Sequence, residues 1–335
     1  MRTKGGRMDR QGLTELLNGY GYTEKQVAEC VEGAVGFEQF LDSSAGNRTV
    51  ESATPEDVHA FAAQLVEAGD TNRNHLVGVY FFANYINNHA MTIGILDLLD
   101  GFEIWENFHR AIGDVLGEEI QAEIFEGLEL PRLGTTPLDW TRLNAIVMPR
   151  LEAVADRETV EQILGSGLRN LPDERYQQAK ERYEELGNLE AFLEARGKQH
   201  FETLQKHHNE DTLYFNQRIT PEVLEFVKKT PEIGRGVRDG NRIIEIKIPH
   251  MSPEYLATDD LKLKQYYVCH CPLVKESIRS DELEISPTFC AFCPSFNAKP
   301  WEVIFGRRLK TEVLESALRG GKWCKFAIYL PEEKL

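Results

Sequence analysis

The hydrophobic pattern of this 335-residue chain changes its period near residue 233. Before that point, apolar residues recur every three to four positions, which is the spacing of a helix that is buried on one side. After it, the segment 242–248 alternates, with Ile244 and Ile246 on one face and Glu245 and Lys247 on the other, as in a half-buried strand. The two periods predict an α+β fold, in which an all-helical N-terminal region precedes a C-terminal domain with an antiparallel sheet.

Helix starts in the first two-thirds of the chain are marked by capping residues. Thr23 with Gln26 forms a capping-box pattern, and Thr54 and Thr220 each precede a proline and an acidic residue. Gly69 is a typical stop for the helix that begins after Thr54. Cys30 falls on the apolar stripe of its helix, which indicates a core residue. Further helices are expected over 74–88, 91–116, 118–126, 138–155, 174–186, 189–208 and 221–229.

The C-terminal region carries strand and turn signals instead. The segment 300–306 is typical of a helix end or turn, and Gly320-Gly321 marks a tight connection between two hairpin strands. Expected strands are 242–248, 265–271, 282–286, 309–318 and 323–330. We therefore expect a helical domain over 1–130, a helical connecting region over 131–232 and an α+β cysteine-containing domain over 233–335.

Charge and hydropathy limit the partners of this chain. The net charge is −16, of which the first 241 residues carry −17 and the remainder +1. An acidic surface repels phosphate backbones, so nucleic-acid binding is disfavoured. No run approaches the roughly 18 apolar residues of a membrane helix, and the charged first ten residues do not resemble a signal peptide. We expect a cytoplasmic protein without membrane contact, with the oligomeric state left open, a homodimer included.

Cysteine spacing is the strongest chemical signal. Five of the six cysteines fall between Cys269 and Cys324. Cys269-x-Cys271 and Cys290-x-x-Cys293 are separated by 18 residues, and four thiolates at such spacing are a typical zinc ligand set. On a regular strand, the side chains of Cys269 and Cys271 would lie about 7 Å apart, too far for one tetrahedral ion. Pro272 could break that strand and close the gap.

Two other interpretations of the cysteines remain open. One is a reactive cysteine beside a ligand pocket, which needs a pKa lowered by a neighbouring cation or histidine such as His270. The other is a set of small buried thiols without chemistry. Cys324 alternates with Phe326 and Ile328, which favours a core position. Ligand contacts are predicted for His270, Tyr267 and Arg307, although the basic residues here could also simply form a basic edge and the aromatic residues a core.

Two segments resemble known families. The stretch 37–91, with Ala53-Thr54-Pro55-Glu56-Asp57-Val58, resembles the SAM-like core-binding domain of tyrosine recombinases. The catalytic pattern of those enzymes does not follow, so recombination is not expected. The closing sequence, about 100 residues that include Gly320-Gly321-x-x-Cys324-x-Phe326-x-Ile328, resembles 4-vinyl-reductase-type domains and L-2-amino-thiazoline-4-carboxylate hydrolase-like proteins. This second resemblance implies a pocketed, ligand-binding fold for residues 233–335.

These observations lead to three functional hypotheses. The preferred one is small-molecule binding with a regulatory or sensory role, in a C-terminal domain that also holds zinc. The second is a cysteine-dependent hydrolase of a small amide or thiazoline-like substrate, which the resemblance permits. The third is a scaffold that uses the acidic helical region as its partner surface. The sequence has no phosphate-binding glycine motif, so nucleotide cofactors have no support.

Overall fold

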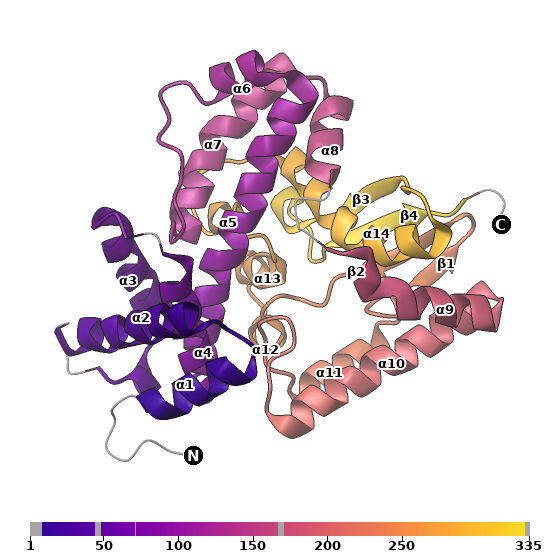
Figure 1. The fold of residues 1–335 in the computed structure, drawn as a ribbon. Coiled ribbons are helices and arrows are strands. Elements are labelled where there is room, and N and C mark those ends of the chain that lie inside the picture. The colour runs from indigo at the N-terminus through magenta and orange to yellow at the C-terminus, as the bar shows by residue number, and fades with distance from the viewer. Residues whose placement is uncertain (1–8, 44–47, 71, 167–170, 332–335) are drawn as a thin grey trace. The chain divides into compact units, whose positions relative to one another are not determined.

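The computed structural model describes residues 9–43, 48–70, 72–166 and 171–331, and the chain forms two compact units. The first unit, called the N-terminal unit here, comprises residues 1–102 and 129–140. The second, called the C-terminal unit, comprises residues 103–128 and 141–335. Helices form the first two-thirds of the chain, and the sheet lies with further helices in the last third, which confirms the predicted α+β class (Figure 1).

The N-terminal unit is a helical bundle around one apolar core. Its largest fully buried side chains include Phe37, Phe82 and Met91. Cys30 is also fully buried, as its place on the apolar stripe predicts. The helices are α1 (Arg10–Gly19), α2 (Glu24–Ser43), α3 (Pro55–Glu67), α4 (Arg73–Tyr85) and the first half of α5 (His89–Leu116), with a 3-10 turn, η1 (Val50–Ser52), before α3.

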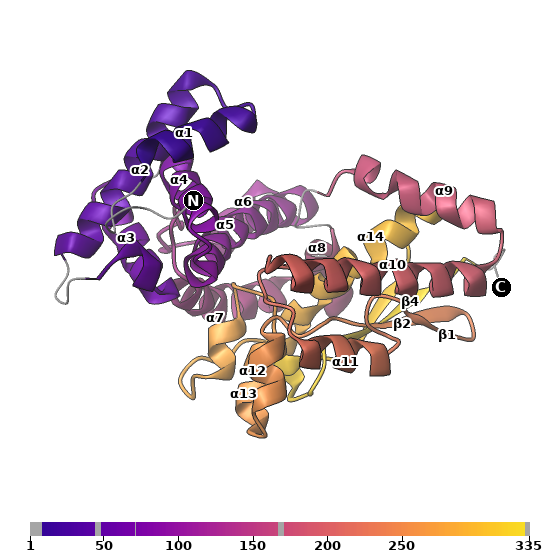
Figure 2. The same ribbon diagram turned by 90° about the horizontal axis from the view of Figure 1, so that it is seen from below.

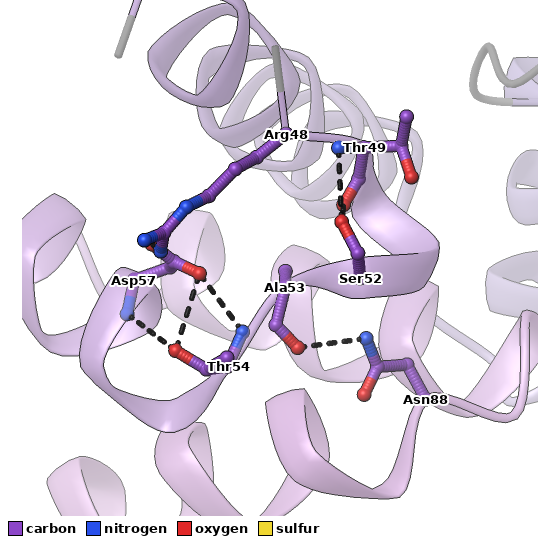
Figure 3. A network of polar contacts seen from close by, with 7 residues as sticks. All are labelled: Arg48, Thr49, Ser52, Ala53, Thr54, Asp57 and Asn88. Atoms are coloured by element: carbon purple, nitrogen blue, oxygen red, sulfur yellow. Dashed lines mark hydrogen bonds and ion pairs between the residues drawn. The ribbon is translucent and has the colours of Figure 1, made fainter. Parts of the chain in front are cut away.

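Local capping explains where α3 begins (Figure 3). The Thr54 backbone N–H donates to a carboxylate oxygen of Asp57 at 2.9 Å, while the Asp57 N–H donates back to the Thr54 hydroxyl at 3.4 Å. Arg48 forms an ion pair with the same carboxylate, and the Asn88 side-chain amide donates to the Ala53 carbonyl at 3.0 Å. The predicted cap at Thr54 is thus confirmed, and its acidic partner ties it to the preceding segment.

Thr54→Ala is expected to lower the free energy of unfolding of the N-terminal unit by about 1 kcal/mol. The reason is that alanine leaves the Asp57 N–H without its hydroxyl acceptor at the helix start. Thr54→Ser keeps the hydroxyl and should remain close to the wild type. Urea unfolding followed by circular dichroism at helical wavelengths measures the difference, and equal midpoints for the two variants would speak against this role of the cap.

The C-terminal unit combines helices with one small sheet. Its 3-10 turns are η2 (Asp173–Tyr176), η3 (Lys275–Ile278), η4 (Pro287–Ala291) and η5 (Ala317–Arg319). Figure 2 shows α12 (Ser252–Ala257) and α13 (Leu261–Val268) lying side by side, as in Figure 1. The helices are the second half of α5, α6 (Glu118–Ile124), most of α7 (Pro137–Val154), α8 (Arg157–Gly165), α9 (Gln177–Leu186), α10 (Leu189–Glu210), α11 (Pro221–Lys229), α12 (Ser252–Ala257), α13 (Leu261–Val268) and α14 (Phe292–Phe305).

The sheet has four antiparallel strands in the order β1-β2-β4-β3. They are β1 (Val237–Asp239), β2 (Arg242–Ile246), β3 (Thr311–Glu315) and β4 (Lys325–Tyr329). The last two pair with each other, with η5 between them, which confirms the predicted hairpin. Gly320, just after η5, has a φ of +80°, a conformation in which glycine is the favoured residue.

Both faces of strand β2 are buried, where a half-buried strand was expected. Ile246 packs in a cluster with residues of α11, and Ile243 on the opposite face packs against Trp301 of α14. Glu245, expected on a solvent face, is only 2% exposed. Its carboxylate accepts hydrogen bonds from the Trp301 indole at 2.9 Å and from the Asn297 amide of α14 at 2.8 Å, and pairs with Arg196. These partners satisfy a charge that would otherwise be costly to bury.

Two predicted strands are wrong. The segment 265–271 is instead the end of helix α13 and the loop after it, because Asp260 caps the helix by accepting the Leu263 N–H at 2.9 Å. The segment 282–286 contains no strand, because the Ser280 hydroxyl accepts the N–H groups of Glu282 and Leu283 and bends the chain. None of the helices in the described ranges is long and apolar enough to cross a membrane.

Candidate metal centre

Five cysteines of the C-terminal unit surround one small cavity. The centre of a water-sized sphere can occupy a volume of about 10 Å³ inside it. The cavity therefore has room for a single water molecule or a single ion. All five side chains are buried and none forms a disulfide. The lining residues are Cys269, Cys271, Val274, Phe289, Cys290, Cys293, Ser316, Ala317, Cys324 and Phe326.

The cysteines reach this cavity from three separate segments of the chain. Cys269 is the residue directly after α13, and Cys271 follows two positions later. Cys290 lies in η4 and Cys293 in the first turn of α14, so a separation of three residues on continuous helical backbone places them on one face. Cys324 directly precedes β4. The predicted proximity of the two cysteine pairs is therefore present, although neither pair lies on a strand.

Electrostatic interactions join four of the thiols. Besides burial, a charge on Cys293 raises the pKa of Cys269, of Cys290 and of Cys324, and Cys269 also acts on Cys290 and Cys324. Cys324 is buried, as the core interpretation predicts, but it also faces the other cysteines across the cavity. Sequence reasoning missed this fourth partner, and its position within 56 residues of Cys269 was the available signal.

Burial keeps these thiols protonated in the metal-free protein. Loss of water raises the pKa of Cys269 to about 11, and burial likewise raises the pKa of Cys290 and Cys324 above the usual value for a thiol. A cysteine nucleophile needs a lowered pKa, since the thiolate is the reactive species. The environment of these three thiols therefore disfavours the nucleophile that the hydrolase hypothesis needs.

Polar donors nevertheless point at two of the sulfur atoms. The Cys271 backbone N–H donates to Cys269, and the Ala317 backbone N–H donates to Cys324. Each of these donors lowers the pKa of the thiol that it faces, because a hydrogen bond to sulfur stabilises the thiolate. Donors of this kind surround the ligands in metal sites, where they orient the ligand and tune its charge.

The donor set suits a soft metal ion, whereas the ligand geometry is not pre-formed. Within the described parts of the chain, no group of three or more His, Cys, Asp or Glu side chains stands arranged to hold a metal. The chemistry of the lining is still specific, because sulfur is its main donor and thiolates select zinc, copper(I) and iron–sulfur clusters. The volume of the cavity suits one ion, whereas a multi-atom cluster would need a larger space.

The three residues predicted to bind a ligand lie outside the lining of this cavity. His270 hydrogen-bonds through Nε2 to the Ile248 carbonyl at 2.7 Å, and its ring centroid lies 5.0 Å from that of His250. Tyr267 is half-buried, and its carbonyl accepts the Met251 N–H at 2.9 Å. Arg307 is exposed after the end of α14. The structure does not bring these three side chains together with the cysteines.

Comparison with protein-family models, curated proteins and solved structures found no significant match to this chain. The resemblances to 4-vinyl-reductase-type domains and to SAM-like domains therefore remain predictions.

Proposed function

We propose that the C-terminal unit is a zinc-binding domain in which the thiolates of Cys269, Cys290, Cys293 and Cys324 hold one Zn²⁺ ion. The observation that carries this proposal is the convergence of buried cysteines from three chain segments on a cavity with room for one atom. Zinc is the expected metal, because it takes four sulfur ligands in structural sites. Each sulfur is one torsion from its backbone, so small χ1 rotations would bring it to the Zn–S distance of roughly 2.3 Å.

This ligand set differs from the one expected from spacing alone in its fourth member. Cys324 replaces Cys271, because Cys324 interacts with Cys269, Cys290 and Cys293, whereas the backbone N–H of Cys271 donates to the sulfur of Cys269. In this arrangement Cys271 positions a ligand. The zinc would join the end of α13, the start of α14 and the start of β4.

The role that we propose for the unit is regulatory or sensory binding of a small molecule, with zinc as a structural element. The support for this part is the resemblance of the closing hairpin to 4-vinyl-reductase-type domains. The cysteine cavity accepts a single atom, so an organic ligand would bind elsewhere in the unit. All six cysteines are free thiols, and thiolate sites persist in reducing compartments, which supports a cytoplasmic location.

The purified, untagged chain is expected to contain about one zinc ion, because a closed four-thiolate site holds its metal through purification. Elemental mass spectrometry measures the zinc. Cobalt(II) exchanged into the reduced protein should then show sulfur-to-cobalt charge-transfer absorption with the intensity of four thiolates. A chain that contains no metal and takes up neither zinc nor cobalt after reduction would contradict the proposal.

A further inference from the structure

A buried serine belongs to the lining of the cysteine cavity. Ser316 lies directly before η5, is only 1% exposed, and borders the cavity together with the five cysteines. Within the described ranges of the chain, its Oγ atom is buried and has no hydrogen-bond partner. Burial of a hydroxyl without a partner is unfavourable and rare in native structures, so such a group calls for an explanation.

Backbone hydrogen bonds fix Ser316 at the start of the connection between β3 and β4. Its carbonyl accepts the N–H of Arg319 at 3.0 Å and the N–H of Gly321 at 3.0 Å. The carboxylate of Glu315, the last residue of β3, accepts the N–H groups of the two residues that precede Cys324, at 2.6 and 3.1 Å. The connection is therefore closed on itself, and it holds Ser316 and Cys324 at its two ends beside the same cavity.

Sulfur atoms are the hydrogen-bond acceptors that the lining side chains offer to this hydroxyl. Apart from Ser316 and the cysteines, the lining consists of the apolar residues Val274, Phe289, Ala317 and Phe326. A protonated thiol is a weak acceptor, whereas a thiolate is charged and accepts a much stronger hydrogen bond. Zinc binding removes the protons of its cysteine ligands, and it thereby creates the acceptor that the Ser316 hydroxyl needs.

We propose that Ser316 is a positioning residue of the zinc centre, whose hydroxyl donates a hydrogen bond to a zinc-bound thiolate. This inference rests on the proposed zinc site. The hydrogen bond stabilises the charged sulfur and fixes its orientation toward the metal, whereas Ser316 itself does not touch the zinc. Cys290 is the expected acceptor, because burial raises the pKa of its thiol and the Ser316 side chain acts in the opposite direction.

The test uses the reduced, full-length protein loaded with zinc or with cobalt(II). Ser316→Ala removes one oxygen atom, and its zinc affinity, measured by competition with a chromogenic chelator, is expected to fall by about 10-fold. The sulfur-to-cobalt charge-transfer band should move to longer wavelength, because a thiolate that has lost its hydrogen bond gives up an electron more easily. A serine that only fills space would leave the position of this band unchanged.

Two sets of variants separate the hydrogen bond from packing. Ser252→Ala removes another buried hydroxyl of the C-terminal unit, one that donates to the Pro249 carbonyl at 2.9 Å and lies outside the cavity lining. It should lower the thermal midpoint yet keep the wild-type zinc affinity and cobalt band. Ser316→Thr and Ser316→Val have the same shape and differ in the hydroxyl, and the extended backbone there (φ −149°, ψ 155°) suits both.

The threonine variant should keep the wild-type band and the valine variant should shift it, a comparison that stands even if Ser316→Ala fails to fold. Wild-type affinity and an unshifted band in Ser316→Ala, or identical bands for threonine and valine, would overturn the inference and leave the zinc site standing. Weaker zinc binding with an unshifted band would also overturn it, because the serine would then act through packing. A wild-type chain that binds neither zinc nor cobalt would overturn the proposed function itself, and this inference with it.

Discussion

Cys293→Ser is expected to abolish zinc binding and to unfold much of the C-terminal unit. Cys293 interacts with Cys269, Cys290 and Cys324, so its loss removes a sulfur atom that acts on each of the other three thiols. Serine offers a harder, protonated oxygen in place of a thiolate. Structural zinc contributes on the order of 10 kcal/mol to folding in small domains, so we expect a loss of more than about 5 kcal/mol, beyond the usual range for a point mutation.

Two matched cysteine variants distinguish the metal site from general damage. Cys271→Ser alters a residue of the same cavity, yet should keep about one zinc per chain, because the backbone N–H that it donates to Cys269 is unchanged. Cys30→Ala lies in the core of the N-terminal unit and should also keep the zinc. Zinc content is measured by elemental mass spectrometry, and unfolding by tryptophan fluorescence in urea.

The outcomes also decide between the two ligand sets. Loss of zinc in Cys324→Ser, with zinc kept in Cys271→Ser, supports the set inferred from the structure. The reverse result would restore Cys269, Cys271, Cys290 and Cys293, the set expected from spacing alone. A Cys293→Ser protein with full zinc content and an unchanged unfolding midpoint would exclude both sets.

The features predicted correctly from the sequence depend on neighbouring residues. Thr54 and Thr220 mark helix starts because a cap needs only a hydroxyl and the N–H three positions later, and both contacts form. The β3–β4 hairpin is equally local, since the glycine after η5 permits the turn between adjacent strands. The segment 265–271 was predicted to be a strand from its Tyr and Val residues, although Asp260 caps a helix there.

The features that were missed depend on residues distant in sequence. Glu245 looks like a solvent-facing strand residue until Asn297 and Trp301 of α14 cover that face and bond to its carboxylate. Cys324 alternates with apolar residues and so resembles a core position, but the fold turns it toward Cys293, 31 positions earlier in the chain. Alternation reports which face a side chain is on, and it carries no information about what covers that face.

The tightest packing in the N-terminal unit predicts a second large effect, that of Gly78→Ala. Gly78 of α4 lies so close to α2 that a Cβ atom there would overlap the carbonyl group of Cys30. Gly33 of α2 meets the backbone of His75 in the same way, so the two helices contact each other through their main chains. Neither backbone can yield as a flexible side chain would, and the helices would have to separate. Overpacking of this kind costs about 3 kcal/mol, against a gain of about 1 kcal/mol in helix propensity.

We therefore expect Gly78→Ala to destabilise the N-terminal unit by at least about 2 kcal/mol, or to lower its thermal midpoint by about 10 °C. Gly36→Ala on α2 is the matched control. A Cβ atom at Gly36 would meet only the ring of Phe61, at 3.6 Å, which is an ordinary contact. This variant should gain stability from helix propensity alone. If both alanine variants melt at the same temperature, the close approach of α2 and α4 does not limit this unit, and the glycines serve no packing role there.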